Sequence, residues 1–233
     1  MSAGPRGGAG ARPVLAALAR AYGDLAEAAA ALDATSCWAP TGCLGWSARD
    51  LLHHLLGDAQ RALVALAVPL PPGSATPDRD AVTYWRDAPS GRADPAQREL
   101  RAERATAATW GLEPLVSTAT GTWVAVVSLA GRTDADALVR TQGHVLRVED
   151  LLSTLVVEAA VHHLDLVVGV DGEGPAAGPL AEARRVLEGL LGRPAPTGGG
   201  DRAWVEVATG RRAPDPEQLR SLGEDARRLP LLG

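Results

Sequence analysis

The chain has 233 residues, a net charge of −5 and a hydrophobic share of 46%. Its arginines are scattered, without the basic stripe that a nucleic-acid surface needs. No apolar run approaches the roughly 20 residues that span a bilayer. The Gly-, Ala- and Arg-rich segment 1–10 also lacks the apolar stretch of a signal peptide. We therefore expect a disordered tail over 1–10, a cytoplasmic location, and neither a nucleic-acid nor a membrane partner. The sequence leaves the oligomeric state open.

Cys37 and Cys43 are the two cysteines of the chain. In a cytoplasmic protein both are expected to be reduced. Their spacing does not match the Cys-x-x-Cys pattern of a structural zinc site. We interpret them as small, half-buried side chains beside Trp38 and Trp46, and the sequence assigns them no further role.

Two long helices are predicted in the first third of the chain. Apolar residues recur at helical spacing from about 11 to 32. The second helix follows Ser47, whose hydroxyl can cap it. Asp50, three residues later, can accept a hydrogen bond from the Ser47 backbone N–H and so complete a capping box. It should end near Val68, because Pro69 and the prolines after it cannot continue a helix. The Pro- and Asp-rich stretch that follows predicts a long loop.

Two more helices are predicted on either side of a short hairpin. The third runs from about 95 to 130 and is expected to be kinked or interrupted at three residues, Gly111, Pro114 and Gly121. Residues 139–141 and 144–146 flank Gly143 and predict a short extended pair. The fourth helix runs from about 148 to 168.

The tail after a Gly-rich linker predicts a small unit of mixed structure. Residues 179–191 read as a helix, and residues 203–208 alternate as Trp-Val-Glu-Val, which predicts a strand. Asp215 can cap a last short helix. The predicted fold class is therefore mainly α: a four-helix bundle over 11–172, followed by a small α+β C-terminal domain over 173–233.

The fourth helix carries the most informative polar residues. At about 100° per residue, Glu158, His162 and Asp165 fall within an arc of roughly 60° at the edge of its apolar face. An ionised glutamate next to a core costs several kcal/mol unless it is paired. Either Glu158 and His162 satisfy each other, or both coordinate a metal ion, since a spacing of four residues places two ligands on one side of an ion. On this helix alone, the self-paired interpretation is the simpler one.

The second helix offers two histidines, His53 and His54. They flank its apolar face on opposite sides, so helical periodicity does not choose between them. His54 has Asp50 and Asp58 one turn to either side, and a carboxylate near a ligating histidine can orient its ring. An Asp–His–Asp ladder on a solvated helix face would look the same, so both histidines remain candidates.

Two motifs resemble a known family. The segment Trp46-Ser-Ala-Arg-Asp-Leu-Leu-His-His54 is similar to the second-helix signature of the mycothiol-dependent maleylpyruvate isomerase family, part of the DinB-like superfamily of four-helix bundles. That signature places a histidine eight residues after the tryptophan, which is His54. The second signature is Glu, three residues, His, two residues, Asp, matched by Glu158, His162 and Asp165. Residues 205–211 are similar to the family's C-terminal strand and turn.

The resemblance implies a site and a chemistry. His54, Glu158 and His162 would be the metal ligands, with Asp165 behind them fixing a histidine tautomer. Zinc is the first expectation, although nitrogen and oxygen donors also accept nickel, cobalt, manganese or iron. The implied cosubstrate is the thiol mycothiol, and the implied reaction is isomerisation or S-transfer on a small-molecule substrate. Arg147 and Arg211 are the candidates for binding the substrate or the thiol.

Two other functions remain open on the sequence. The first is a metal-dependent hydrolase that uses a metal-bound water, because one fold can host several chemistries. The second is a non-catalytic binding or regulatory module that retains the bundle. A thiol enzyme needs a cationic pocket beside the ion, a hydrolase needs a general base near the bound water, and a binding module needs neither.

Overall fold

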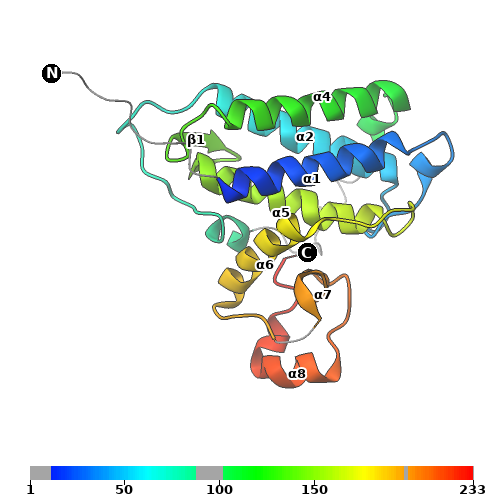
Figure 1. Ribbon diagram of the computed structural model, residues 1–233, viewed down its shortest axis with the longest axis vertical. Helices are drawn as coiled ribbons and strands as arrows, with labels where there is room; N and C mark the ends of the chain where they lie inside the picture. The colour runs from blue at the N-terminus through cyan, green and yellow to red at the C-terminus, as the bar shows by residue number, and fades with distance from the viewer. Residues whose placement is uncertain (1–11, 88–101, 197–198, 233) are drawn as a thin grey trace.

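Four long helices form the body of the protein, seen in the computed structural model of Figure 1. The structure describes residues 12–87, 102–196 and 199–232. The helices are α1 (Pro13–Ala30), α2 (Ala48–Ala67), α4 (Leu112–Ala130) and α5 (Val148–Leu166). Helix α1 packs against α4 and α5, and α2 packs against the same two helices from the other side. The predicted four-helix bundle is confirmed. The predicted tail over 1–10 lies outside the described residues.

The start of α2 is fixed by the predicted capping box. The Ser47 hydroxyl accepts a hydrogen bond from the Asp50 backbone N–H at 3.3 Å. In return, the Asp50 carboxylate accepts from the Ser47 backbone N–H at 2.9 Å. The helix ends at Ala67, two residues before Pro69. This local chemistry sets where α2 begins, and therefore which of its side chains face α5.

Removing this cap should lower the stability of the whole bundle. We expect Ser47→Ala to reduce the free energy of unfolding by about 1 kcal/mol, because the first-turn N–H groups lose a partner. Urea unfolding followed by circular dichroism measures the change. Ser117→Ala, on an exposed face of α4, is the control and should change stability by less than about 0.5 kcal/mol.

The third predicted helix is broken before Gly111. Residues 102–107 are helical, and α4 then begins after Gly111, whose backbone is extended. Pro114 lies in the first turn of α4. Backbone N–H groups there have no intrahelical partner, so a proline at this position costs no hydrogen bond. The expected interruption at Gly121 is wrong, because α4 continues through it to Ala130. The predicted start near 95 lies outside the described residues.

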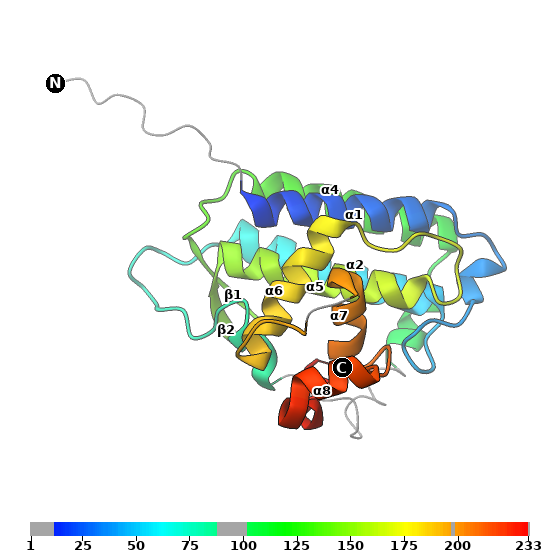
Figure 2. The same ribbon diagram turned by 60° about the horizontal axis from the view of Figure 1, so that its bottom comes forward.

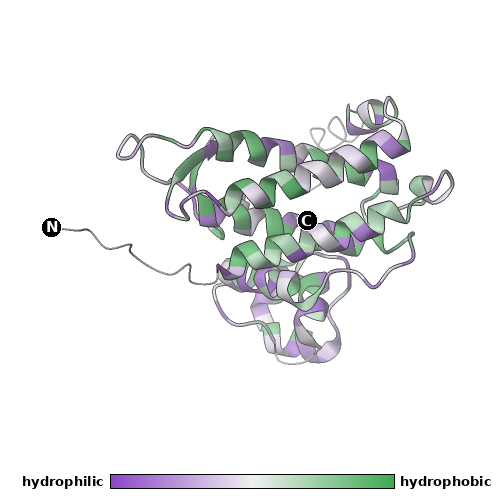
Figure 3. Cartoon of the chain, turned by 45° about the horizontal axis from the view of Figure 1, so that its top comes forward, coloured by the Kyte–Doolittle hydropathy of each residue, from purple (hydrophilic) through white to green (hydrophobic). Residues whose placement is uncertain are grey.

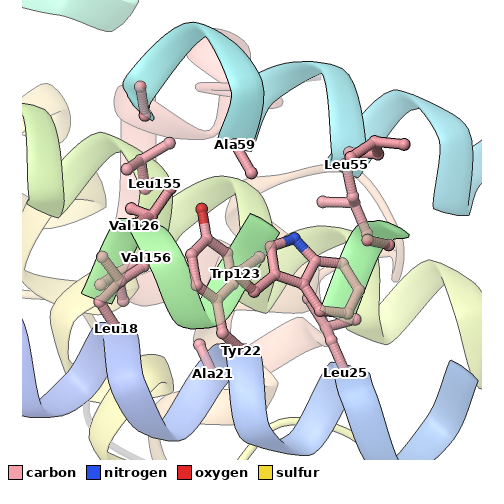
Figure 4. Packing of buried hydrophobic residues seen from close by; sticks show 14 of the residues in the cluster. Leu18, Ala21, Tyr22, Leu25, Leu55, Ala59, Trp123, Val126, Leu155 and Val156 are labelled. Atoms are coloured by element: carbon pink, nitrogen blue, oxygen red, sulfur yellow. The ribbon is translucent and has the colours of Figure 1, made fainter. Parts of the chain in front are cut away.

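Helix α4 presents one stripe of side chains to the bundle core: Leu115, Ala119, Trp123, Val126 and Ala130. Trp123 stacks on Tyr22 of α1 with ring centroids 5.6 Å apart, as Figure 4 shows.

Among the described residues, α4 is also the helix that is long and apolar enough to cross a membrane by length and composition alone. The core helix of a soluble bundle passes the same test.

A two-stranded hairpin leads directly into α5. The predicted extended pair is present as strands β1 (Leu138–Thr141) and β2 (His144–Arg147), which pair antiparallel with Thr141 opposite His144. The two loop residues, Gln142 and Gly143, both have positive φ angles, 46° and 83°. Positive φ at both central residues is the signature of a type I′ turn. Helix α5 begins at Val148, immediately after β2.

The C-terminal part is helical where the sequence predicts a strand. Its elements are α6 (Ala177–Leu191), α7 (Gly200–Ala208) and α8 (Pro216–Leu222), followed by a 3₁₀ turn over Gly223–Arg228. The strand predicted over 203–208 is wrong, because these residues belong to α7. Within the described residues, the C-terminal part contains no strand and is corrected from α+β to α. Asp215 caps α8 as predicted.

Helix α5 lies between two apolar clusters. One side packs into the bundle, whereas Val157, Ala160, Val161 and Leu164 pack with α6 and α7. Figure 2 shows α6 and α7 lying across the face of the bundle next to α5, and Figure 3 shows hydrophobic stretches on the bundle helices. A helix buried on two sides can hold polar side chains only where they find partners. The domain boundary predicted at 172 stays a prediction.

Two short 3₁₀ turns complete the fold near the bundle. They span Ser36–Trp38, before the loop that leads to α2, and Thr83–Asp87, after the long loop that follows α2. The second turn carries Tyr84 and Trp85 against α5 and α6, so the loop from 69 to 87 is anchored at its end.

Candidate metal centre

His54, Glu158 and His162 form one cluster inside the bundle. Each offers one ligand atom, and these three atoms lie within 4.8 Å of one another. Glu158 Oε2 lies 3.1 Å from His162 Nε2, one turn along α5. The ring of His54, from α2, meets the ring of His162 edge-on with centroids 5.1 Å apart. We call these three residues the triad.

His53 takes no part in the triad. Its Nδ1 lies 2.6 Å from Glu103 Oε2, and its ring faces Trp110. His54 is held by Trp46, whose ring contacts it edge-on with centroids 5.2 Å apart. The structure therefore brings together the three residues that the sequence named as ligands, and the ligand role itself stays a prediction.

Burial and neighbouring charges set the protonation of the triad. Burial and the charge of His162 lower the pKa of His54 to about 4, so that His54 is neutral near neutral pH. Burial would raise the pKa of Glu158, but the hydrogen bond and charge of His162 outweigh it and lower that pKa. Burial would lower the pKa of His162, but hydrogen bonds to Asp165, Cys43 and Glu158 raise it well above its ordinary value. Without an ion, ionised Glu158 therefore faces protonated His162.

This donor set suits a divalent ion. Two imidazole nitrogens and one carboxylate oxygen are the three-ligand pattern of catalytic metal sites, which leave positions open for other groups. Such donors accept several transition metals and do not single out zinc. Because imidazole binds metals in its neutral form, an ion would displace the proton of His162.

Asp165 lies behind His162 as the centre of a hydrogen-bond network. Its side chain is 1% exposed and accepts from His162 Nδ1 at 3.0 Å. Arg211 donates to both of its oxygens, from Nε at 2.8 Å and from Nη2 at 2.6 Å. Burial would raise the pKa of Asp165, but the bonds from His162 and Arg211 hold it far below its ordinary value. An ionised carboxylate at this place fixes the ring of His162 with Nε2 toward Glu158.

The loop before α2 adds Cys43 to this network. Its Sγ lies 3.1 Å from Asp165 Oδ2 and 3.7 Å from His162 Nδ1, so that Cys43, His162 and Asp165 form a second group of potential metal ligands. The guanidinium of Arg211 already occupies the same carboxylate, and its positive charge opposes a cation there. We therefore interpret Cys43 as a hydrogen-bond donor that supports Asp165. Cys37 is buried elsewhere, near Ala34 O.

The contact between this loop and α5 requires glycine at position 42. The Gly42 N–H donates to the Asp165 backbone oxygen at 2.9 Å, and a Cβ at Gly42 would collide with the Asp165 carboxylate. We expect Gly42→Ala to destabilise the protein by about 1–3 kcal/mol and to weaken ion binding. Urea unfolding and metal titration measure both effects. Gly23→Ala is the control, because a Cβ at Gly23 meets open space in α1.

One protein family matches this chain. The family model described as mycothiol maleylpyruvate isomerase N-terminal domain covers residues 18–167. The match spans more than half of the chain and includes the whole triad. The chain belongs to this family. The resemblance inferred from the two motifs is thereby confirmed. No curated protein and no solved structure matches the chain.

The two arginines that the sequence proposed as binding residues lie in different surroundings. Arg147 pairs with the exposed Asp136 at 2.9 Å and stands at the start of α5. Glu158 lies eleven residues further along, about 16 Å along the helix axis. Arg211 reaches the network behind His162, where its Nε and Nη2 are bonded to Asp165 and its Nη1 to Thr209 O. For this member of the maleylpyruvate isomerase family, binding by either residue stays a prediction.

Arg61 is the cation beside the triad that the sequence analysis did not identify. It forms an ion pair with Asp58 one turn earlier on α2, and its charge acts on both His54 and Glu158. The spacing from His54 to Asp58 to Arg61 is four and then three residues, which places them along one face of α2. That spacing is the signal that could have revealed Arg61.

Proposed function

We propose that the protein is a divalent-metal-dependent enzyme that uses mycothiol as its thiol cosubstrate, as an isomerase or an S-transferase. The single observation that carries this proposal is the convergence of two imidazoles and one carboxylate in a chain of the mycothiol maleylpyruvate isomerase family. A closed structural site would use a fourth protein ligand, whereas this triad leaves room for a thiol or a substrate oxygen.

The residues of this chain would act as follows. Neutral His54, ionised Glu158 and His162 would hold the ion. Bound there, a divalent ion would acidify a thiol and polarise a carbonyl group. Asp165 keeps His162 oriented with Nε2 toward Glu158, and Trp46 covers the ring of His54. Arg61 supplies positive charge at the side of Glu158.

Two neighbouring histidines provide a matched test of ligand identity. Protein made without a histidine tag is loaded in turn with zinc, nickel, cobalt or manganese, and its metal content is measured by mass spectrometry. We expect one ion per chain, loss of that ion in His54→Ala, and full content in His53→Ala. Full metal content in His54→Ala would show that the ligand assignment is wrong.

The same loaded protein tests the reaction. We expect mycothiol-dependent turnover either of a cis-unsaturated acid, by isomerisation, or of a panel of electrophiles, by thioether formation. Hydrolysis of esters or amides without any thiol would favour the hydrolase. A bound ion with no turnover of either kind would favour a binding module.

A further inference from the structure

In the described part of the chain, α1 and α4 leave an apolar face of the bundle uncovered. The two helices lie side by side (Figures 1 and 2), and a groove of about 320 Å³ runs between them with an almost wholly apolar lining. From 114 to 131 the sequence of α4 contains no charged residue, and Val124 is 64% exposed. We call the outward side of residues 13–30 and 114–131 the α1–α4 face. An extended apolar face of this kind marks an interaction surface.

Two glycines lie on this face in the middle of their helices. Gly23 of α1 and Gly121 of α4 are exposed, and a Cβ at either position would meet no neighbouring atom within 4 Å. Packing within the chain therefore does not require glycine there, although glycine is less stable than alanine inside a helix. Glycine does allow another backbone to approach closely. Both glycines are explained if a further helix packs on the α1–α4 face.

The charges on α1 show what that helix is. Arg20 and Glu27 are both exposed, and their spacing of seven residues places them on one side of α1, two turns apart. A second α1 packed antiparallel, with a two-fold axis midway between these residues, would bring each Arg20 to Glu27 of the partner subunit. A parallel packing would bring like charges together. The α1 surface is therefore complementary to itself in the antiparallel direction.

Helix α4 has a complementary pair of its own. Val124 and Gly121 are both exposed and lie one turn apart. Around a two-fold axis midway between them, each Val124 would lie over Gly121 of the partner subunit. A projecting side chain would then meet a position without one, which is the shape match that close packing of two helices needs.

The two midpoints lie at the same height of the bundle. Leu15 of α1 lies beside Gly131 of α4, and Tyr22 stacks on Trp123. The helices are therefore antiparallel, and residues 23 and 24 of α1 are level with residues 122 and 123 of α4. These are the midpoints of the charged pair on α1 and of the valine–glycine pair on α4. A single two-fold axis consequently satisfies both helices.

We propose that the α1–α4 face binds a second copy of this chain, as a two-fold dimer in which α1 and α4 each pack antiparallel against their counterparts. The triad residues come from α2 and α5, on the other side of the bundle, so the dimer leaves both triads uncovered by the partner. The inference therefore does not depend on the proposed function.

The size of the face predicts a weak and reversible dimer. Residues 114–131 span about 27 Å along the helix axis, and two helices side by side are about 20 Å wide. The footprint is then roughly 500 Å² on each chain and about 1,000 Å² in total, at the lower limit for a specific interface. We therefore expect a Kd in the micromolar range and a monomer in dilute solution.

Analytical ultracentrifugation from about 1 μM to about 500 μM protein measures this association. Val124→Glu places a charge at the centre of the interface and should raise the dimer Kd at least about hundredfold. Val64→Glu is the control, because Val64 of α2 is a valine that is 67% exposed and lies outside the α1–α4 face. Val124→Glu should keep the helical circular dichroism and the metal content of the natural protein.

Charge exchange tests the arrangement of the two copies. Arg20→Glu and Glu27→Arg each turn both ion pairs of the dimer into like-charge contacts, so each variant alone should dimerise about tenfold more weakly. An equimolar mixture of the two variants should associate as tightly as the natural protein, because every contact then joins opposite charges. Such recovery does not arise from a change in the folding of either chain.

Three results would overturn the proposal. The first is a natural protein that stays monomeric at the highest concentration. The second is a dimer that Val124→Glu does not weaken, or a mixture of the charge variants that does not recover. The third is flotation of the natural protein with phosphatidylcholine vesicles that Val124→Glu abolishes, without self-association, which would show that the face meets a membrane instead.

Discussion

Replacing Glu158 with glutamine should abolish tight metal binding while leaving the fold intact. The amide has nearly the same shape as the carboxylate but brings no charge to the ion, so we expect the affinity for Zn²⁺ or Co²⁺ to fall more than hundredfold. That exceeds the tenfold to hundredfold loss that follows removal of a residue behind a ligand. The free energy of unfolding of the metal-free protein should fall by about 1 kcal/mol or less, because the Glu158 side chain is 29% exposed and its ion pair with His162 is partly solvated.

The same substitution should also shift the titration of His162. Glu158 is one of three hydrogen-bond partners that raise the pKa of His162, together with Asp165 and Cys43. The pKa of His162 should therefore fall in Glu158→Gln, as an NMR pH titration can measure. Glu149→Gln is the control on the same helix, because Glu149 is similarly exposed and pairs with Arg12. Retention of tight metal binding in Glu158→Gln would remove Glu158 from the ligand set.

The sequence predicts best those features that depend on neighbouring residues. The capping box at Ser47, the cap at Asp215 and the turn at Gly143 each involve contacts within a few positions, so residue type and spacing determine them. The four bundle helices follow from apolar periodicity over many turns. The wrong strand at 203–208 shows the limit of this approach. Trp204, Val205, Val207 and Ala208 are buried in α7, and so short a run fits a helix face as well as a strand.

The candidate site was predictable where one helix carries it. Glu158, His162 and Asp165 share one edge of α5, and their spacing alone placed them together. Periodicity did not separate His53 from His54, because both flank the apolar face of α2. The resemblance to the family motif selected His54 by its spacing from Trp46, and the packing of α2 against α5 places His54 in the triad and leaves His53 with Glu103.

Contacts between distant segments were not visible in the sequence. Cys43 and Arg211 meet Asp165 from segments 122 and 46 residues away. Neither has a local pattern that marks it as part of a metal site. Arg61 is different, since its distance of seven residues from His54 is a helical repeat that could have been noticed. The tertiary fold therefore determines which residues surround the triad to a greater extent than it determines the members of the triad.

Replacing Asp165 with asparagine should lower both metal affinity and stability. Asparagine cannot hold the ring of His162 and the guanidinium of Arg211 as an ionised carboxylate does. We expect a tenfold to hundredfold loss of affinity for Co²⁺ and a loss of about 3 kcal/mol in the free energy of unfolding, because Arg211 loses its partner in a buried pair. Asp24→Asn, at a buried carboxylate on α1, is the control and should leave the Co²⁺ affinity unchanged.

The stability difference between the natural protein and Asp165→Asn should disappear in acid. The pKa of Asp165 is lowered in the folded state, so its ionised form stabilises the fold above the unfolded pKa of about 3.9. This contribution is lost as the pH falls from that value through the lower folded pKa. Urea unfolding of metal-free protein should therefore give a difference that shrinks below about pH 4. A difference that persists unchanged in acid would mean that Asp165 stabilises the protein by shape and packing, and not through the ionic bonds to Arg211 and His162.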